Sequence, residues 1–182
     1  MLEKVLEAFK YSLKYEKSIL RRYLILGSFD GILLTMGIVV SALATNLSVR
    51  DTNLATISGI TAVAISSAWN SLVVEAKEKI EEYNELQRQM MRSLKGTIYD
   101  YGTKATIFLS TITHGSSPFL GIILLLSYDY SRNLGIIIGI SMIVLFLLGL
   151  SYEGSFKEKV LSGLLILIAG VITAVITVIL NT

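Results

Sequence analysis

Asp30 is an acidic residue inside an otherwise apolar run, residues 23–47. A helix of about 20 mostly apolar residues crosses a bilayer, and a carboxylate within it costs roughly 2.5–3.5 kcal/mol. Such a group is tolerated at a protein interior or wet cavity, where it binds a cation, carries a proton or forms a structural pair. Gly27 and Gly31 allow another backbone to approach, so we expect Asp30 to face a neighbouring helix. A cation or proton site is the favoured interpretation.

A second apolar run, residues 54–74, leads into an acidic stretch. Asn70 and Glu75 offer oxygen ligands to a divalent cation, although hydrogen bonds between helices explain the polar residues of this run equally well. Further carboxylates follow at spacings of three and four residues, and Met90 adds a thioether suited to a transition metal. These candidate ligands are Glu78, Glu82 and Glu85. The alternative is a solvated face, since basic residues lie nearby.

The third apolar run, residues 105–126, holds His114, the single histidine, and Pro118, the single proline. Pro118 has no amide hydrogen, so the carbonyl of His114 loses its helical partner. Within a membrane such a carbonyl lines a cavity or contacts another helix. We expect Thr35, Ser67, His114 and Pro118 to line a path, with an interhelical hydrogen bond as the alternative role of His114.

Five apolar runs predict five transmembrane helices in an all-α integral membrane protein. The chain has 182 residues, 53% hydrophobic and 16% charged, whereas soluble domains have about 25% charged residues. Residues 1–22 predict an interfacial amphipathic helix, and residues 23–182 a membrane domain that includes a cytoplasmic helical extension and connector at 75–104. The five spans are residues 23–47, 54–74, 105–126, 134–151 and 160–180.

Basic residues lie mainly on one side of this topology. Of the 16 lysines and arginines, only Arg50 and Arg132 fall on the other side. The positive side faces the cytosol, so we expect a cytoplasmic N-terminus. A net charge of +2 does not indicate a nucleic-acid partner, and without cysteine the chain has no thiolate site. Hydrolase and nucleotide-binding motifs are absent, so we expect no enzyme.

A set of segments in order resembles the vacuolar iron transporter family. Residues 26–31, Leu-Gly-Ser-Phe-Asp-Gly, followed by Thr35-Met36-Gly37, are similar to its first span. Residues 108–118 resemble its third span, while 146–149, 162–164 and 169–174 resemble its last two. The resemblance covers about residues 22–180 and implies a short, prokaryotic-type member with a reduced cytoplasmic metal-binding segment.

The resemblance implies a homodimer in membrane lipid that moves Fe²⁺, Mn²⁺ or a similar divalent metal out of the cytosol by proton antiport. No permanently bound cofactor is implied. The intramembrane aspartate of the family maps onto Asp30, and the acidic end of its second span onto Glu75. Where members have a methionine in the second span, this chain has Trp69-Asn70. The membrane is the cell membrane in a prokaryote, and a vacuolar or organellar membrane otherwise.

Two alternatives remain open on the residues themselves. A dimeric scaffold or sensor without transport would join along a heptad-spaced seam, leave Asp30 as a packing pair and tolerate loss of Glu78 and Glu82. A transporter of another small solute would share the fold but not a metal-responsive acidic stripe. The seam consists of Ala76, Ile80, Tyr83, Met90 and Leu94.

Overall fold

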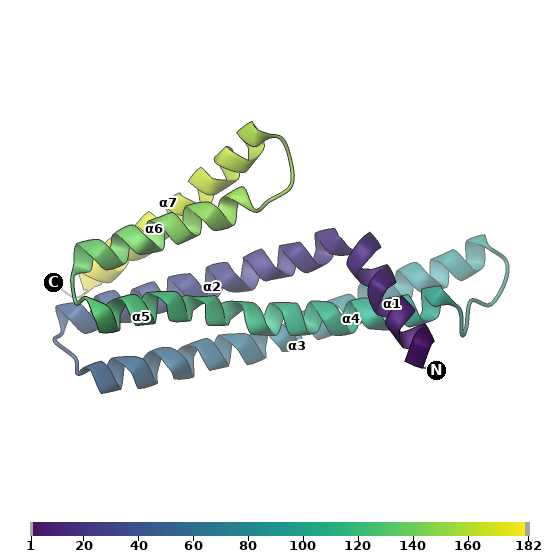
Figure 1. Ribbon diagram of the computed structural model, residues 1–182, viewed down its shortest axis with the longest axis horizontal. Helices are drawn as coiled ribbons and strands as arrows, with labels where there is room; N and C mark the ends of the chain where they lie inside the picture. Colours follow the sequence, from purple (N-terminus) through teal and green to yellow (C-terminus); the bar gives the residue numbers. More distant parts are fainter. Residues whose placement is uncertain (1, 181–182) are drawn as a thin grey trace. The chain divides into compact units, whose positions relative to one another are not determined.

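The computed structural model describes residues 2–180, and all regular structure in this range is helical (Figure 1). This confirms the all-α prediction. The elements are α1 Leu2–Tyr15, α2 Lys17–Ala44, α3 Val49–Gln89, α4 Ile98–Ser116, the 3₁₀ helix η1 Ser117–Gly121, α5 Ile122–Tyr130, α6 Leu134–Leu150 and α7 Phe156–Leu180. The helix predicted over residues 1–22 is interrupted at Glu16, between α1 and α2.

Four helical segments are long and apolar enough to cross a membrane. They are α2, α3, α7 and the continuous segment Ile98–Tyr130, which joins α4, η1 and α5. The predicted fourth span corresponds to α6, which has 17 residues and rises about 25 Å, somewhat less than the roughly 30 Å of hydrocarbon. The chain therefore has the helices of an integral membrane protein, with one shorter apolar helix beside them.

Side-chain caps fix where two of these helices begin. The Ser48 hydroxyl donates to the Asp51 carboxylate at 2.6 Å, and the Asp51 amide donates back to the Ser48 hydroxyl oxygen at 3.1 Å. Such reciprocal pairing satisfies an amide at the first turn of α3. At the start of α6, the Asn133 side chain accepts hydrogen bonds from two backbone amides. Polar residues in the short links thus set the helix boundaries.

The chain divides into two compact units, each discontinuous in sequence. Unit 1 combines the N-terminal residues up to Leu24 with Ile65–Ser116, and unit 2 combines Ile25–Ala64 with the segment from Ser117 onward. In unit 1, α1 packs against α4 (Figure 1). The Ser12 and Thr106 hydroxyls lie 2.6 Å apart at this contact. The N-terminal helix is therefore bound to its own chain along one face.

Unit 2 is built on an apolar core and on the hairpin of α6 and α7 (Figure 1). The core includes Ile32 and Met36 of α2 and Leu145 of α6, all fully buried. Within the hairpin, a Cβ added at Gly149 would overlap the backbone of Gly163. Glycine at this crossing lets the two helices pack closely, as small residues do in membrane proteins.

The backbone of α2 also touches that of η1 in unit 2. A Cβ at Gly31 would overlap the carbonyl of Pro118, and one at Gly121 would overlap the Gly31 carbonyl. The Thr35 hydroxyl donates to that same carbonyl at 2.8 Å. The third apolar run, predicted as a single span, changes its helical form near Pro118, where α4 ends at Ser116 and η1 follows. The close approach predicted from Gly31 is confirmed.

Candidate functional site

Glu75 of α3 is a fully buried carboxylate in unit 1. Its residue is 0% exposed, and its Oε1 accepts a hydrogen bond from the Tyr23 hydroxyl at 2.8 Å. The Arg22 guanidinium lies 3.5 Å from the same oxygen and is itself largely exposed. The second oxygen, Oε2, has no hydrogen-bond partner in the part of the chain that the structure describes. A buried oxygen left in this way is costly unless a proton or a cation occupies it.

His114 lies beside Tyr23, the residue that donates a hydrogen bond to Glu75. The rings of Tyr23 and His114 are 4.9 Å apart between centroids, and His114 also interacts with the backbone of Ser67 in α3. Both Ser67 and His114 are buried. The two roles that the sequence left open for His114, lining a path or bonding to another helix, both stay predictions. Helices α2, α3 and α4 thus each place one group in the cluster of Tyr23, Glu75 and His114.

One carboxylate of the acidic stripe beyond Glu75, that of Glu82, is paired with Lys79, which the sequence analysis counted only among the nearby basic residues. The Lys79 ammonium lies 2.7 Å from a Glu82 oxygen and 3.1 Å from a Glu16 oxygen, and its side chain is 7% exposed. Glu78 and Glu85 are exposed. Among the side chains that the structure describes, residues 4–180, no three His, Asp or Glu residues are placed to hold one metal ion. Of the three glutamates of the stripe beyond Glu75, only Glu82 makes an ion pair with a described residue.

Replacing Lys79 by methionine is expected to lower the free energy of unfolding by about 1–3 kcal/mol, because the half-buried Glu16 carboxylate loses its charged partner. The contribution of Glu82, which is largely exposed, is smaller. Thermal unfolding in detergent measures the change. Lys77→Met is the matched control, since Lys77 is an exposed neighbour on the same helix. Equal losses of stability in both variants would contradict the importance of this buried ion pair.

The remaining candidates divide between the two units. Asp30 lies in unit 2, half-buried in α2, and makes no hydrogen bond or ion pair with another described residue. Thr35 and Pro118 are buried in the same unit. In unit 1, Asn70 is exposed and Met90 is 39% exposed. Within residues 4–180, Asp30 and Glu75 are therefore acidic side chains that combine at least partial burial with unused hydrogen-bonding capacity.

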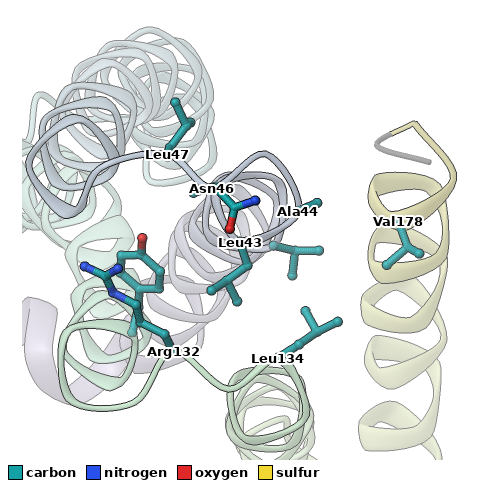
Figure 2. Close-up of a pocket in the computed structure, with 10 residues that line it drawn as sticks. Leu43, Ala44, Asn46, Leu47, Arg132, Leu134 and Val178 are labelled. Atoms are coloured by element: carbon teal, nitrogen blue, oxygen red, sulfur yellow. The ribbon is translucent and has the colours of Figure 1, made fainter.

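A further cavity in unit 2 lies at the end of α2 (Figure 2). Its volume is about 490 Å³, and Arg132 is the only charged residue among the described residues that line it. The cavity is lined by Leu43 of α2 and Leu47 of the link after α2, together with Leu134 of α6 and Val178 of α7 (Figure 2). Sequence reasoning missed this cavity. The signal available was Arg132, one of only two basic residues on its side of the predicted topology.

Comparison of the chain with models of protein families, with curated proteins and with solved structures finds no match.

Proposed function

We propose that the chain is a membrane transporter that moves a divalent metal such as Fe²⁺ or Mn²⁺ out of the cytosol in exchange for protons. The observation that carries this proposal is Glu75, fully buried with one carboxylate oxygen unpartnered among the described residues. Protons and metal ions both bind a carboxylate oxygen, so occupation by one opposes occupation by the other. That competition is the minimum requirement for antiport.

Asp30 supplies the second acidic group of the proposal. Its place in an apolar helix long enough to span the membrane and its lack of an ion-pair partner within residues 2–180 are typical of intramembrane acids with a functional role. The resemblance of residues 26–37 to the first span of vacuolar iron transporters supports the same role. In this proposal Asp30 receives the metal within the membrane, and Glu75 exchanges metal for a proton at the cytoplasmic end of its span.

The proposal includes a homodimer joined in part through α3. Ser66 and Asn70 lie one turn apart on this helix, and both are exposed, as is Trp69 between them. Polar side chains that would face lipid are costly, whereas a second helix provides them with hydrogen-bond partners. Ser66 is also small enough to let a second copy of α3 approach closely. Chemical crosslinking of the purified protein through single cysteines at these positions reports the contact.

The test of the function is metal flux into liposomes that contain the purified protein and an internal metal-sensitive dye. We expect Fe²⁺ or Mn²⁺ flux that increases with an opposing proton gradient. Asp30→Asn is expected to abolish this flux while leaving expression and the unfolding temperature near those of the wild type. Asp129→Asn, an exposed substitution of the same chemistry, is the control and should retain full flux.

Full transport by Asp30→Asn would contradict the proposed mechanism. Absence of flux for either metal, in a protein shown to be folded, would favour the scaffold or another solute. The pairing of Glu82 with Lys79 is the observation that favours the scaffold reading, since it gives that part of the acidic stripe a structural role. A proton gradient that leaves metal flux unchanged would instead remove antiport and retain a metal channel.

A further inference from the structure

The contact between α1 and α4 leaves an open groove on unit 1. Ala8 and Ser12 of α1 are buried against α4, and the ring of Phe9 meets that of Phe108 edge to face, with centroids 6.1 Å apart. Beside these contacts lies a groove of about 320 Å³. Its lining among the described residues is mostly apolar, with Lys104 the one charged side chain, and includes Val5 and Phe9 of α1 with Tyr101 and Phe108 of α4.

The groove crosses the level at which α4 becomes apolar. Lys104 is the last charged residue before the apolar run 105–126, and its side chain is 70% exposed. One turn further on, Phe108 is 53% exposed. Lysine at the end of a membrane span places its ammonium among lipid headgroups, while the aromatic ring one turn deeper faces acyl chains. A polar end and an apolar end thus follow each other along one groove.

Helix α1, which lines one side of the groove, exposes three lysines and one glutamate, Glu7, within residues 4–15. Lys4, Lys10 and Lys14 are exposed on this helix, which also exposes Leu6 and Leu13. Exposed lysines and leucines on a short helix are typical of binding at an anionic membrane surface. The basic side of the predicted topology faces the cytosol, where the leaflet carries anionic lipids. The occupant that complements both charge and apolar lining is an anionic phospholipid.

Lys104 forms an ion pair but keeps hydrogen-bond donors for a phospholipid. The Lys104 ammonium lies 2.7 Å from an Asp100 oxygen, and the other Asp100 oxygen accepts the Gly96 amide at 2.9 Å. Asp100 is therefore held in place by the loop before α4. An ammonium group has three hydrogens to donate, so Lys104 can bind a phosphate while it remains paired with Asp100.

We propose that this groove binds one anionic phospholipid of the cytoplasmic leaflet. Lys104 contacts the lipid phosphate, and an acyl chain lies along Phe9 and Phe108. The bound lipid fills the space that α1 leaves beside α4, and so strengthens the attachment of the N-terminal helix to unit 1. The site does not depend on the proposed transport function.

The test is lipid retention by the purified full-length chain, measured by native mass spectrometry. Protein in detergent is mixed with phosphatidylglycerol and phosphatidylcholine of identical acyl chains. The wild type is expected to retain phosphatidylglycerol in preference to phosphatidylcholine. In Lys104→Gln the ratio of retained phosphatidylglycerol to phosphatidylcholine should fall about fivefold, which is the contribution of one lysine near an anionic surface. Lys104→Arg should keep the wild-type ratio.

Two further variants separate the groove from general surface charge. Lys95→Gln removes an exposed lysine of the same unit that lies outside the groove, and should retain the wild-type preference. Val5→Trp fills the groove without changing the charge, and should lose the bound lipid. Circular dichroism verifies the fold of each variant. Should Val5→Trp fail to fold, the contrast between Lys104→Gln and Lys104→Arg decides.

Three results would overturn the proposal. Equal retention of the two lipids by the wild type would remove the anionic selectivity. Equal losses in Lys104→Gln and Lys95→Gln would show attraction to surface charge in place of a site. A wild-type protein that retains no lipid and has the mass of a dimer would assign the groove to a second copy of the chain.

Discussion

Alanine at Gly31 is expected to destabilise the protein by about 3 kcal/mol, the upper range for inserting a methyl group into a packed interior. The added Cβ would overlap the backbone carbonyl of Pro118. A backbone carbonyl, unlike a flexible side chain, moves only if η1 moves. For a chain of this length the loss corresponds to about 6–12 °C in the unfolding temperature. Thermal unfolding of the purified protein in detergent measures it.

Gly139 provides the matched control for this substitution. It also lies within a helix, α6, but a Cβ added there meets nothing within 4 Å. Gly139→Ala is therefore expected to leave the unfolding temperature unchanged or to raise it slightly, because alanine favours a helix over glycine by up to about 1 kcal/mol. Equal unfolding temperatures for the two variants would show that α2 and η1 do not pack as closely as described.

Glutamine at Glu75 is expected to reduce metal flux at least about tenfold, with little change in the unfolding temperature. The glutamine carbonyl can still accept the hydrogen bond from the Tyr23 hydroxyl, so the packing of α2 on α3 is kept. The charge that binds a cation and the oxygen that takes a proton are lost together. A tenfold effect corresponds to only about 1.4 kcal/mol of binding free energy, which is modest for a buried charge. Liposome flux with an internal dye measures it.

Glu81→Gln serves as the control for this experiment, because Glu81 is exposed on the same helix. Its flux should equal that of the wild type. Tyr23→Phe tests the structural role of the same contact. Loss of the hydroxyl leaves Oε1 of Glu75 with Arg22, 3.5 Å away, as its partner. This variant should lower the free energy of unfolding by about 1.5–3 kcal/mol. Wild-type flux in Glu75→Gln would assign the carboxylate a structural role alone.

Local pattern predicted the helices but not which helices meet. Apolar runs placed the candidate spans, and Pro118 marked the His114 carbonyl as one that loses its helical partner, because both inferences depend on near neighbours in sequence. The partners of Glu75 lie far away: Tyr23 is 52 residues earlier. Spacing along one helix carries no information about such contacts, so the cluster around Glu75 could not be assembled from the sequence.

The acidic stripe is a second case in which the sequence could not predict contacts between distant residues. Carboxylates three and four residues apart share one helical face whether they bind a cation or pair with a lysine. Lys79 lies on that face too, but its second partner, Glu16, belongs to the segment between α1 and α2, 63 residues away. The break at Glu16 has no proline or glycine to signal it. Without that break the position of Glu16 beside α3 could not be expected.

The hairpin of a 17-residue α6 and a 25-residue α7 has a consequence for the surrounding lipid. The apolar helix α6 rises about 25 Å and the apolar part of α7, residues 160–180, about 32 Å, so one flat bilayer does not match both. The hydrophobic mismatch is relieved when α7 tilts and the bilayer thins beside α6. Both adjustments cost free energy. The cost of thinning the bilayer beside α6 increases with the thickness of the bilayer. A bilayer with a thin hydrocarbon layer would therefore accommodate this hairpin at a lower free-energy cost than a thick one.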